Sequence, residues 1–417
     1  MLLPSAKRVT GVKKLLAAGL LIASCGAAAQ DNRPDGVTGA TWQFGPLNRW
    51  AYTHIREILP TKDIPNDYKT VRPLAGLSGA VEDLEITLDG KRFQLSAAME
   101  KNYVDGLLVL KNGRVVVERY AGTLTPERTH LLWSVSKTIT GLTAASVAAD
   151  GLIDLNKTVG DYVPELAESG WGTDTLRTLL DMRDTSNWNE DYSAPDSTVR
   201  RQDCADGLLT GEMCLDTKVI GNYKFLPAVG RDESRADTFI YKSGTTDVIA
   251  WVLEAATGER FADLVSERLW KPMGAERSAA ITVDVSGFTL ASGGMVATLR
   301  DLARVGQLML DRGKVGDRQV IPAAWMDDIF NQPGDPSWSA PKPFGTAPYY
   351  RSFVWGVGDG NATVQARGVH GQVIDVSPST GTVVAVFSSW PDASGGAPGV
   401  GGAETEMLIK AVKAAVN

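Results

Sequence analysis

Cysteine and histidine are scarce in this chain, since its 417 residues include only 3 of each. The histidines, His54, His130 and His370, lie far apart, and neither Cys-x-x-Cys nor His-Glu-x-x-His occurs, so a metal site finds little support. Flavin and nicotinamide motifs are absent too. The glycine-rich segment 395–402 lacks the Lys-Ser/Thr pair of a phosphate loop and is most simply a flexible connection. We therefore expect neither a metal nor a cofactor.

Long apolar runs are also missing, because nothing reaches the roughly 20 apolar residues that a membrane-spanning helix needs. Residues 1–29 instead combine a basic start, an apolar stretch over 15–23 and three alanines ending at Ala29, which is typical of a secretory signal peptide. Cleavage after Ala29 predicts a periplasmic or secreted protein. The alternative is a lipoprotein anchored through Cys25, because Ile22-Ala23-Ser24-Cys25 resembles a bacterial lipoprotein cleavage site.

Positive charge is in deficit as well. The formal net charge of −7 becomes −11 once the four positive charges of residues 1–29 are removed, and an acidic exterior argues against nucleic acid as a partner. The two cysteines outside the leader, Cys204 and Cys214, lie in a polar segment that contains glycine. In an oxidising compartment they are a candidate disulfide that closes a short loop.

The most informative stretch is Leu131–Leu142, which places Ser134 and Lys137 three residues apart at the start of an apolar helix. Residues i and i+3 share a helix face, so the hydroxyl and the amine can meet. Burial and the positive end of the helix dipole both favour a neutral amine, which can accept the proton of the serine. The Ser134 N–H at the helix start could stabilise an oxyanion.

Two further groups lie later in the chain. Tyr241 and Ser243 stand two apart at the end of an apolar segment and so point the same way if it is extended. A lysine near Tyr241 would favour its phenolate, and the two side chains together could move the serine's proton to a leaving group. The segment 365–376 reads as a glycine-bearing strand that pairs with 382–387, and an N–H from it could complete an oxyanion hole.

The expected organisation has two lobes, because about 390 residues exceed one ordinary core. Residues 106–110 and 115–120 predict a β-hairpin with Asn112-Gly113 at its turn, and helical spacing appears at 48–58, 175–182, 246–257, 261–270 and 299–310. A final helix runs through Met407 to Ala415. We assign 30–130 and 345–417 to an α/β sheet lobe, and 131–344 to a mainly helical lobe that carries Ser134 and Tyr241.

Ser-x-x-Lys, then Tyr-x-Ser about a hundred residues later, then a glycine-bearing strand near the C-terminus is an order that chance rarely supplies. On these motifs the chain resembles the serine β-lactamase and penicillin-binding protein superfamily, on its class C and esterase side, and within it the 6-aminohexanoate-dimer hydrolases. The likeness includes Asn-Glu-Asp-Tyr ending at Tyr192, Ser292-Gly293-Gly294-Met295 and Val369-His370-Gly371-Gln372. It implies an α/β (α+β) fold in which an antiparallel sheet is flanked by helices and a mostly helical lobe is inserted.

The resemblance also implies roles for individual residues. Ser134 would be the nucleophile, Lys137 its proton acceptor and Tyr241 the general acid/base. Around the substrate it implies Ser243 and Ser292 nearby, Tyr192 closing over the amide, Asp203 contacting a substrate amine, and Trp355 as a pocket wall. Ala366-Arg367-Gly368 stands where penicillin-recognising enzymes carry Lys-Thr-Gly, which places the second oxyanion N–H at Val369, next to Gly368. A register centred on His370-Gly371 is the alternative, and Arg367 is a candidate to replace the missing lysine.

The expected function is therefore a secreted serine hydrolase that cleaves linear amides through an acyl-enzyme on Ser134, with a small molecule as substrate and a monomer or homodimer as its state. A carboxylesterase, a D-amino-acid peptidase or a β-lactamase on the same scaffold is the first alternative. A non-catalytic module that binds cell-wall fragments is an alternative of another class. A Ser-His-Asp hydrolase has less support, because no Gly-x-Ser-x-Gly occurs and only His130 or His370 could serve.

Overall fold

The structure is a computed structural model that describes residues 32–76, 83–215, 217–332 and 347–416. It contains largely antiparallel β-sheets packed against helices. The predicted leader 1–29, with Cys25, lies outside the described residues. Everything below belongs to the unit Arg33–Asn417. In the described part of the chain the largest sheet runs in the order β12 (Tyr350–Arg351), β13 (Val354–Gly356), β14 (Val364–Gly368), β15 (Gln372–Ser377), β16 (Thr382–Ser388), β5 (Val104–Lys111), β6 (Arg114–Tyr120) and β2 (Ala75–Gly76).

The large sheet takes its strands from residues 75–120 and 350–388, and within it only the short pair β2–β6 is parallel. The predicted hairpin 106–120 is confirmed by the pairing of β5 with β6. Its turn residues Asn112 and Gly113 have φ of 49° and 74°. Both values are positive, as a type I′ turn requires, which explains why Asn-Gly stands there.

The predicted strand 365–376 is wrong as one unbroken element. It is two antiparallel strands, β14 and β15, joined by a tight turn at Val369–Gly371. The chain reverses there because His370 and Gly371 have φ of 59° and 91°, values that do not continue a strand. The predicted pairing with 382–387 is confirmed by β15 and β16. The turn thus sits at the end of β14, where it can face another element.

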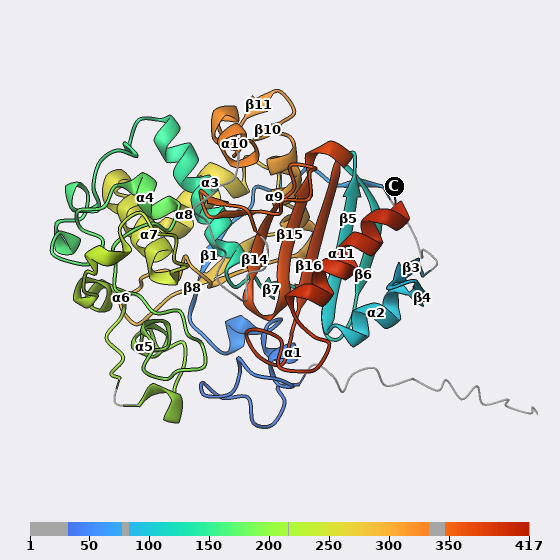
Figure 1. Cartoon of the computed structure of the whole chain (residues 1–417), viewed down its shortest axis with the longest axis horizontal. Coiled ribbons are helices and arrows are strands. Elements are labelled where there is room, and N and C mark those ends of the chain that lie inside the picture. The colour runs from blue at the N-terminus through green and yellow to red at the C-terminus, as the bar shows by residue number, and fades with distance from the viewer. Residues whose placement is uncertain (1–31, 77–82, 216, 333–346, 417) are drawn as a thin grey trace, which may run out of the picture. The chain divides into compact units, whose positions relative to one another are not determined.

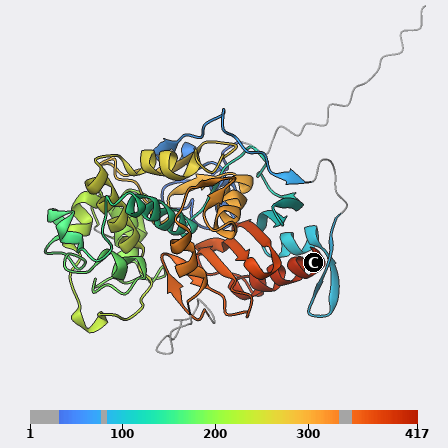
Figure 2. The same cartoon turned by 90° about the horizontal axis from the view of Figure 1, so that it is seen from above.

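Helices cover both faces of the large sheet (Figures 1 and 2). On one face, Leu408 and Ile409 of α11 (Gly402–Val416) pack with residues of α2 (Leu95–Lys101) and with β5 and β16. On the other face lies α9 (Leu299–Leu310). A Cβ on Gly306 would come within 2.5 Å of Val383, so glycine is required for α9 to approach the sheet this closely. This is the predicted α/β class.

The middle of the chain is mainly helical. A smaller sheet runs β1 (Thr61–Ile64), β8 (Ala279–Thr282), β9 (Met295–Ala297) and β7 (His130–Leu131), and two short pairs are β3 (Glu85–Leu88) with β4 (Lys91–Gln94) and β10 (Lys314–Val315) with β11 (Arg318–Gln319). The other α-helices are α1 (Asn48–Ala51), α3 (Val135–Ala149), α4 (Leu176–Leu180), α5 (Thr198–Ala205), α6 (Asn222–Phe225), α7 (Ser243–Thr257), α8 (Phe261–Val265) and α10 (Ala323–Phe330). The long apolar helices α3 and α7 pack against each other.

Two predicted helices are shorter than expected. The segment 48–58 gives α1 and a 3-10 turn at Ile55–Glu57, because the Thr53 hydroxyl and the His54 ring bond back to the Trp50 carbonyl and compete with the helix. The segment 261–270 divides into α8 and a π-helical turn at Ser266–Trp270. Within the described residues no helix is both long and apolar enough to cross a membrane.

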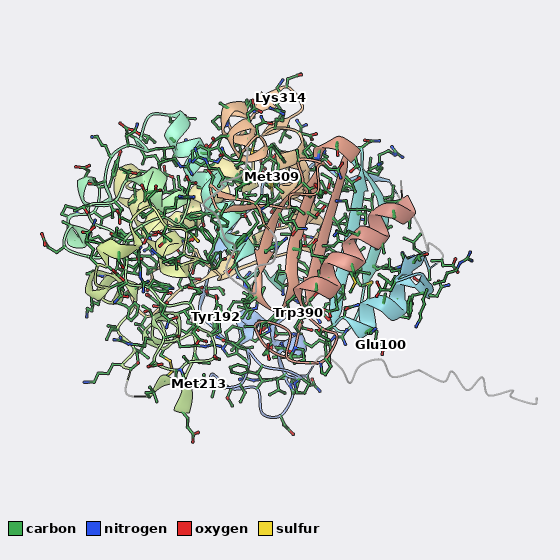
Figure 3. The ribbon with its side chains drawn as sticks, viewed as in Figure 1. Glu100, Tyr192, Met213, Met309, Lys314 and Trp390 are labelled. Carbon is green, nitrogen blue, oxygen red and sulfur yellow. A yellow bond between two sulfur atoms is a disulfide. The ribbon has the colours of Figure 1, made fainter. Side chains whose placement is uncertain are left out.

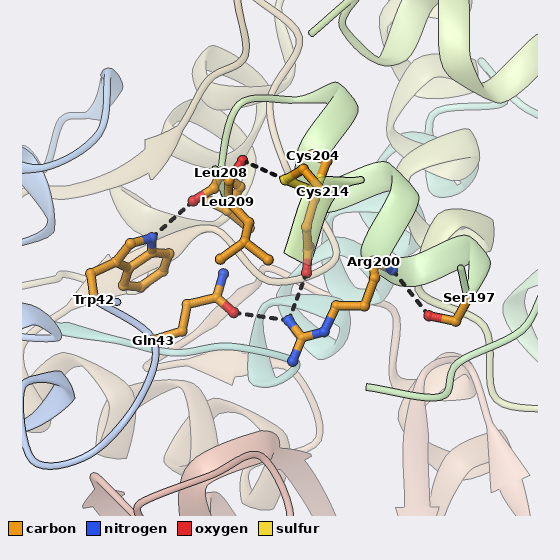
Figure 4. The surroundings of a disulfide bond; sticks show 9 residues. Trp42, Gln43, Ser197, Arg200, Cys204, Leu208, Leu209 and Cys214 are labelled. Carbon is orange, nitrogen blue, oxygen red and sulfur yellow. Dashed lines mark hydrogen bonds and ion pairs between the residues drawn. A yellow bond between two sulfur atoms is a disulfide. The ribbon is translucent and has the colours of Figure 1, made fainter. Parts of the chain in front are cut away.

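A disulfide joins Cys204, in the last turn of α5, to Cys214, ten residues further along the chain (Figure 4). Arg200 stands one turn earlier on the same helix and donates a hydrogen bond to the Gln43 side chain. Nearby, the Trp42 indole N–H donates to the Leu208 carbonyl. The disulfide therefore restrains the C-terminal end of α5, near the contacts that Arg200 and Leu208 make with the N-terminal segment.

Replacing both cysteines by serine is expected to lower the free energy of unfolding by about 2–3 kcal/mol, because the unfolded chain regains the entropy of a roughly ten-residue loop. Urea unfolding of the double variant against the oxidised wild type measures this. The reduced wild type is the matched control and should lose a similar amount. Identical unfolding midpoints in all three samples would contradict a stabilising disulfide.

Candidate active site

Ser134 lies at the junction between β7 and α3, where the chain turns sharply. Trp133 has φ of 45°, a left-handed conformation that costs a bulky residue about 1–3 kcal/mol. Its indole is held between Trp42 (centroids 5.6 Å apart) and His370 (5.6 Å), and this stacking keeps the strained turn in place. Ser134 follows as the N-cap of α3. The turn thus fixes the serine at the start of the buried helix.

Lys137 meets Ser134 as the spacing predicts. Its Nζ donates to Ser134 Oγ at 2.7 Å and to the backbone carbonyl of Ser292 at 2.7 Å, and only 1% of the residue is exposed. Burial lowers the pKa of the Lys137 amine to about 8, although the nearby carboxylates of Glu190, Asp247 and Asp203 act in the opposite direction. The lowered pKa agrees with the predicted tendency toward a neutral amine.

Tyr241 completes this group. Its hydroxyl shares a hydrogen bond with Ser134, and the Lys137 amine lies 5.1 Å from its ring centroid. The prediction that the lysine favours the phenolate is wrong, because burial dominates and raises the pKa of Tyr241 well above its ordinary value. Trp355 also stacks on the tyrosine ring, with centroids 5.5 Å apart. The structure therefore presents a neutral phenol that packs against Trp355.

The end of β14 lies directly beside Ser134. A Cβ added to Gly368 would be 3.1 Å from the Ser134 backbone nitrogen and 2.8 Å from the Leu132 carbonyl, so only glycine fits there. Val369 follows at the start of the turn. The alternative register at His370 has less support, because the His370 N–H already donates to the Ala393 carbonyl at 3.1 Å.

The imidazole of His370 is buried and does not serve as a base. Its Nδ1 bonds to the Trp390 carbonyl at 2.8 Å, and burial lowers the pKa of His370 to about 4. His130 is fully buried as well and stacks on Phe387 at 4.6 Å. Neither histidine is placed beside the Ser134 hydroxyl to form a Ser-His-Asp arrangement.

Arg367 is not brought to the site. It precedes Gly368 on β14 and so points to the opposite face of the sheet. There its guanidinium pairs with Glu406 of α11 at 3.0 Å. The interpretation that Arg367 replaces the missing lysine of penicillin-recognising enzymes is therefore wrong, because its side chain does not face the site.

The loop before α5 brings Tyr192 and a carboxylate that sequence reasoning passed over. The Tyr192 hydroxyl, labelled in Figure 3, donates to Glu190 at 2.6 Å. Glu190 also accepts the Ser243 backbone N–H at 2.9 Å and the Ser243 hydroxyl. Its charge acts on Lys137 and on Tyr241. The Asn-Glu-Asp-Tyr motif contains Glu190, but it led to a predicted role for Tyr192 alone.

Asp203 also lies near the site, but it is already paired. Arg200 donates to its carboxylate at 3.0 Å, and both side chains are largely buried. Burial raises the pKa of Asp203 to about 6, while Arg200 acts to lower it. A substrate ammonium at Asp203 would therefore compete with the guanidinium of Arg200.

Ser292 contacts Lys137 through its backbone carbonyl, and its own N–H and hydroxyl both donate to Asp247, at 2.9 and 3.0 Å. Asp247 is fully buried on α7, and no sequence pattern singled it out. In the described part of the chain no group of histidine, cysteine or acidic side chains is arranged to hold a metal.

Known proteins are similar to this chain over most of its length. The beta-lactamase family model matches residues 95–399. A 6-aminohexanoate-dimer hydrolase from Paenarthrobacter ureafaciens is 35% identical over 377 residues, 88% of this chain and 90% of that protein.

Solved structures add the fold. A candidate 6-aminohexanoate-dimer hydrolase from Bacillus anthracis has a TM-score of 0.80 at 27% identity, covering 90% of this chain and 95% of that one. EstCE1, a hydrolase with promiscuous acyltransferase activity, has a TM-score of 0.58 at 18% identity over 77% of this chain and 96% of its own, which shows a shared fold alone. The chain belongs to the beta-lactamase family and is a serine hydrolase of amides or esters, similar over most of its length to the 6-aminohexanoate-dimer hydrolases.

Proposed function

We propose that this protein hydrolyses small linear amides through an acyl-enzyme on Ser134. The observation that carries the proposal is the buried contact of 2.7 Å between Ser134 Oγ and Lys137 Nζ, with the Tyr241 hydroxyl on the same oxygen. A hydroxyl, an amine of lowered pKa and a neutral phenol are the parts that acyl transfer needs.

In the first half-reaction, neutral Lys137 takes the proton of Ser134 as Oγ bonds to the carbonyl carbon. The oxyanion that forms is held by the N–H groups of Ser134 and Val369, since Gly368 brings the Val369 turn beside the helix start. The carbon–nitrogen bond then breaks as Tyr241 gives its proton to the leaving nitrogen. Lys137 returns its proton to Tyr241.

In the second half-reaction, water attacks the ester on Ser134. Tyr241 takes the water's proton as it passes its own proton to neutral Lys137, and Lys137 then gives that proton to Ser134 Oγ as the carbon–oxygen bond breaks. Both halves use the same groups, so the chain's own side chains supply every proton transfer.

The charges around Ser134 support a substrate with a cationic end. Glu190 and Asp203 lie close enough to act on Lys137, whereas Arg200 is occupied by Asp203 and Arg367 faces away. These carboxylates favour a linear amide with a free amine. A dimer of 6-aminohexanoate, which the name of the Paenarthrobacter relative suggests, carries such an amine at one end and a carboxylate at the other.

Exchanging Glu190 for glutamine is expected to raise KM for an amine-terminated linear amide about tenfold, because one charge-assisted contact is lost. Steady-state kinetics on a 6-aminohexanoate dimer and on a neutral p-nitrophenyl ester measure the effect. At a pH above the Lys137 pKa of about 8, where Lys137 is neutral with or without the charge of Glu190, the ester should change little. Asp191→Asn, an exposed neighbour on the same loop, is the matched control. An equal loss on both substrates would assign Glu190 to loop structure instead.

The pH dependence follows from Lys137. Because only the neutral amine accepts the serine's proton and burial brings the pKa of Lys137 down to about 8, kcat/KM should rise with pH up to about 8 and level off above it. Initial rates on a neutral ester, whose own charge does not change, test this. A rate that falls between about pH 6 and 8 would contradict Lys137 as the proton acceptor.

A substrate panel tests the proposed function itself. Protein without residues 1–29 is assayed on a linear aminohexanoate dimer, p-nitrophenyl esters of graded chain length, D-alanyl peptides and nitrocefin. Mass spectrometry with a fluorophosphonate locates the acylated residue. We expect the linear amide to be cleaved and the adduct to be on Ser134; an unlabelled Ser134 would remove the proposal. Secretion belongs to the proposal too, and N-terminal sequencing of the exported protein should begin at Gln30.

A further inference from the structure

The buried carboxylate of Asp247 links helix α7, through Ser292, to Lys137 on α3. Asp247 lies on α7, which begins just after Tyr241, and it binds both the N–H and the hydroxyl of Ser292. The carbonyl of the same Ser292 accepts Lys137 Nζ at 2.7 Å. Asp247 therefore fixes the position of Ser292, whose carbonyl binds Lys137.

The charge of Asp247 also acts on the pKa of Lys137. The groups that act on Lys137 come from different elements: Glu190 from the loop, Asp203 from α5, Asp247 from α7 and the ring of Tyr241. Asp247 itself faces Lys137, Ser292, the Gln202 side chain at 2.8 Å and, further along, Asp206. Burial raises the pKa of Asp247 to about 7, although Gln202, Ser292 and Lys137 act to lower it, so the carboxylate carries its charge from about neutral pH upward. Of the carboxylates that act on Lys137, Glu190 also binds Ser243 and Tyr192, and Asp203 is paired with Arg200. Among the described residues, Lys137 is the cation that acts on Asp247.

We propose that Asp247 is a positioning residue for Lys137: it holds the Ser292 carbonyl against the amine and supplies the buried negative charge that balances the ammonium. It acts through Ser292 and through its charge, and does not touch the substrate. The inference rests on the proposed function, since it presumes that Lys137 exchanges a proton with Ser134.

Asp247→Asn tests this through the pH profile. Removing the charge makes the Lys137 ammonium less stable, so the rising limb of kcat/KM should move to lower pH by about one unit. The ester assay and the rate of fluorophosphonate labelling are followed from about pH 5 to about pH 10. Asp301→Asn is the matched control, because Asp301 is fully buried and its carboxylate accepts hydrogen bonds from Arg304 and from the Thr298 hydroxyl at the start of α9. It should leave the limb in place.

A second variant reaches the same charge by another route. Gln202→Leu removes a hydrogen bond that favours the Asp247 carboxylate, so the limb should move in the same direction by a smaller amount. This keeps the test available if Asp247→Asn does not fold. A limb that stays in place in a folded, labelled variant overturns the role of Asp247 while leaving the proposed function standing. Failure of wild-type Ser134 to label overturns both.

Discussion

Ser134→Ala should fold as the wild type does and lose about 10⁵-fold in kcat/KM, because the covalent route disappears and only binding and the oxyanion groups remain. The loss of Oγ removes one acceptor of Lys137, whose amine keeps its bond to the Ser292 carbonyl. The fold is expected to persist because Ser134 is the N-cap of α3 without a side-chain capping bond. Circular dichroism, ester hydrolysis and fluorophosphonate labelling measure fold, rate and adduct in one preparation.

Ser136→Ala is the matched control for that variant. Ser136 lies on the same helix, is fully buried and only accepts a hydrogen bond from the Met295 N–H at 3.3 Å. It should retain labelling and most of the rate. A Ser134→Ala protein with wild-type activity, or labelling that persists in it, would show that the nucleophile is elsewhere.

The local chemistry of the site was predictable because its spacing lies within one helical turn. Ser134 and Lys137 need only a helix to meet, and the apolar residues around them predict that helix. The Asn112-Gly113 hairpin is equally local, since its turn residues carry the required positive φ. Patterns of this kind depend on a few neighbouring residues and not on how the rest of the chain folds.

The remaining features depend on contacts between segments far apart in the sequence. Glu190 and Asp247 reach Lys137 only once the loop and α7 are packed against α3. No local pattern marks Asp247, and the Asn-Glu-Asp-Tyr motif gives no role to Glu190. Burial raises the pKa of Tyr241, and burial is a property of the whole fold. The turn at Val369–Gly371 was not predicted for a similar reason, because histidine at position 370 does not by itself indicate a left-handed backbone conformation.

Tyr241→Phe should separate amides from esters. Departure of an amine requires a proton, so we expect amide hydrolysis to fall by about 10³-fold. A p-nitrophenolate leaves without a proton, so the ester should lose only about tenfold, through the missing contact to Ser134. The ring of phenylalanine keeps the stacking on Trp355 at 5.5 Å, so the geometry of Ser134 should be preserved. Parallel kinetics on a linear aminohexanoate dimer and a p-nitrophenyl ester give the ratio directly.

Tyr350→Phe is the matched control, because Tyr350 is a buried tyrosine whose ring packs edge-on against Tyr241 at 6.0 Å. Its loss of a hydroxyl should affect the two substrates equally and slightly. If Tyr241→Phe lowered amide and ester hydrolysis by the same factor, the phenol would act in forming the acyl-enzyme rather than in releasing the amine. Lys137 would then be the remaining group able to protonate the leaving nitrogen, since among the described residues it is the other proton donor bonded to Ser134 Oγ.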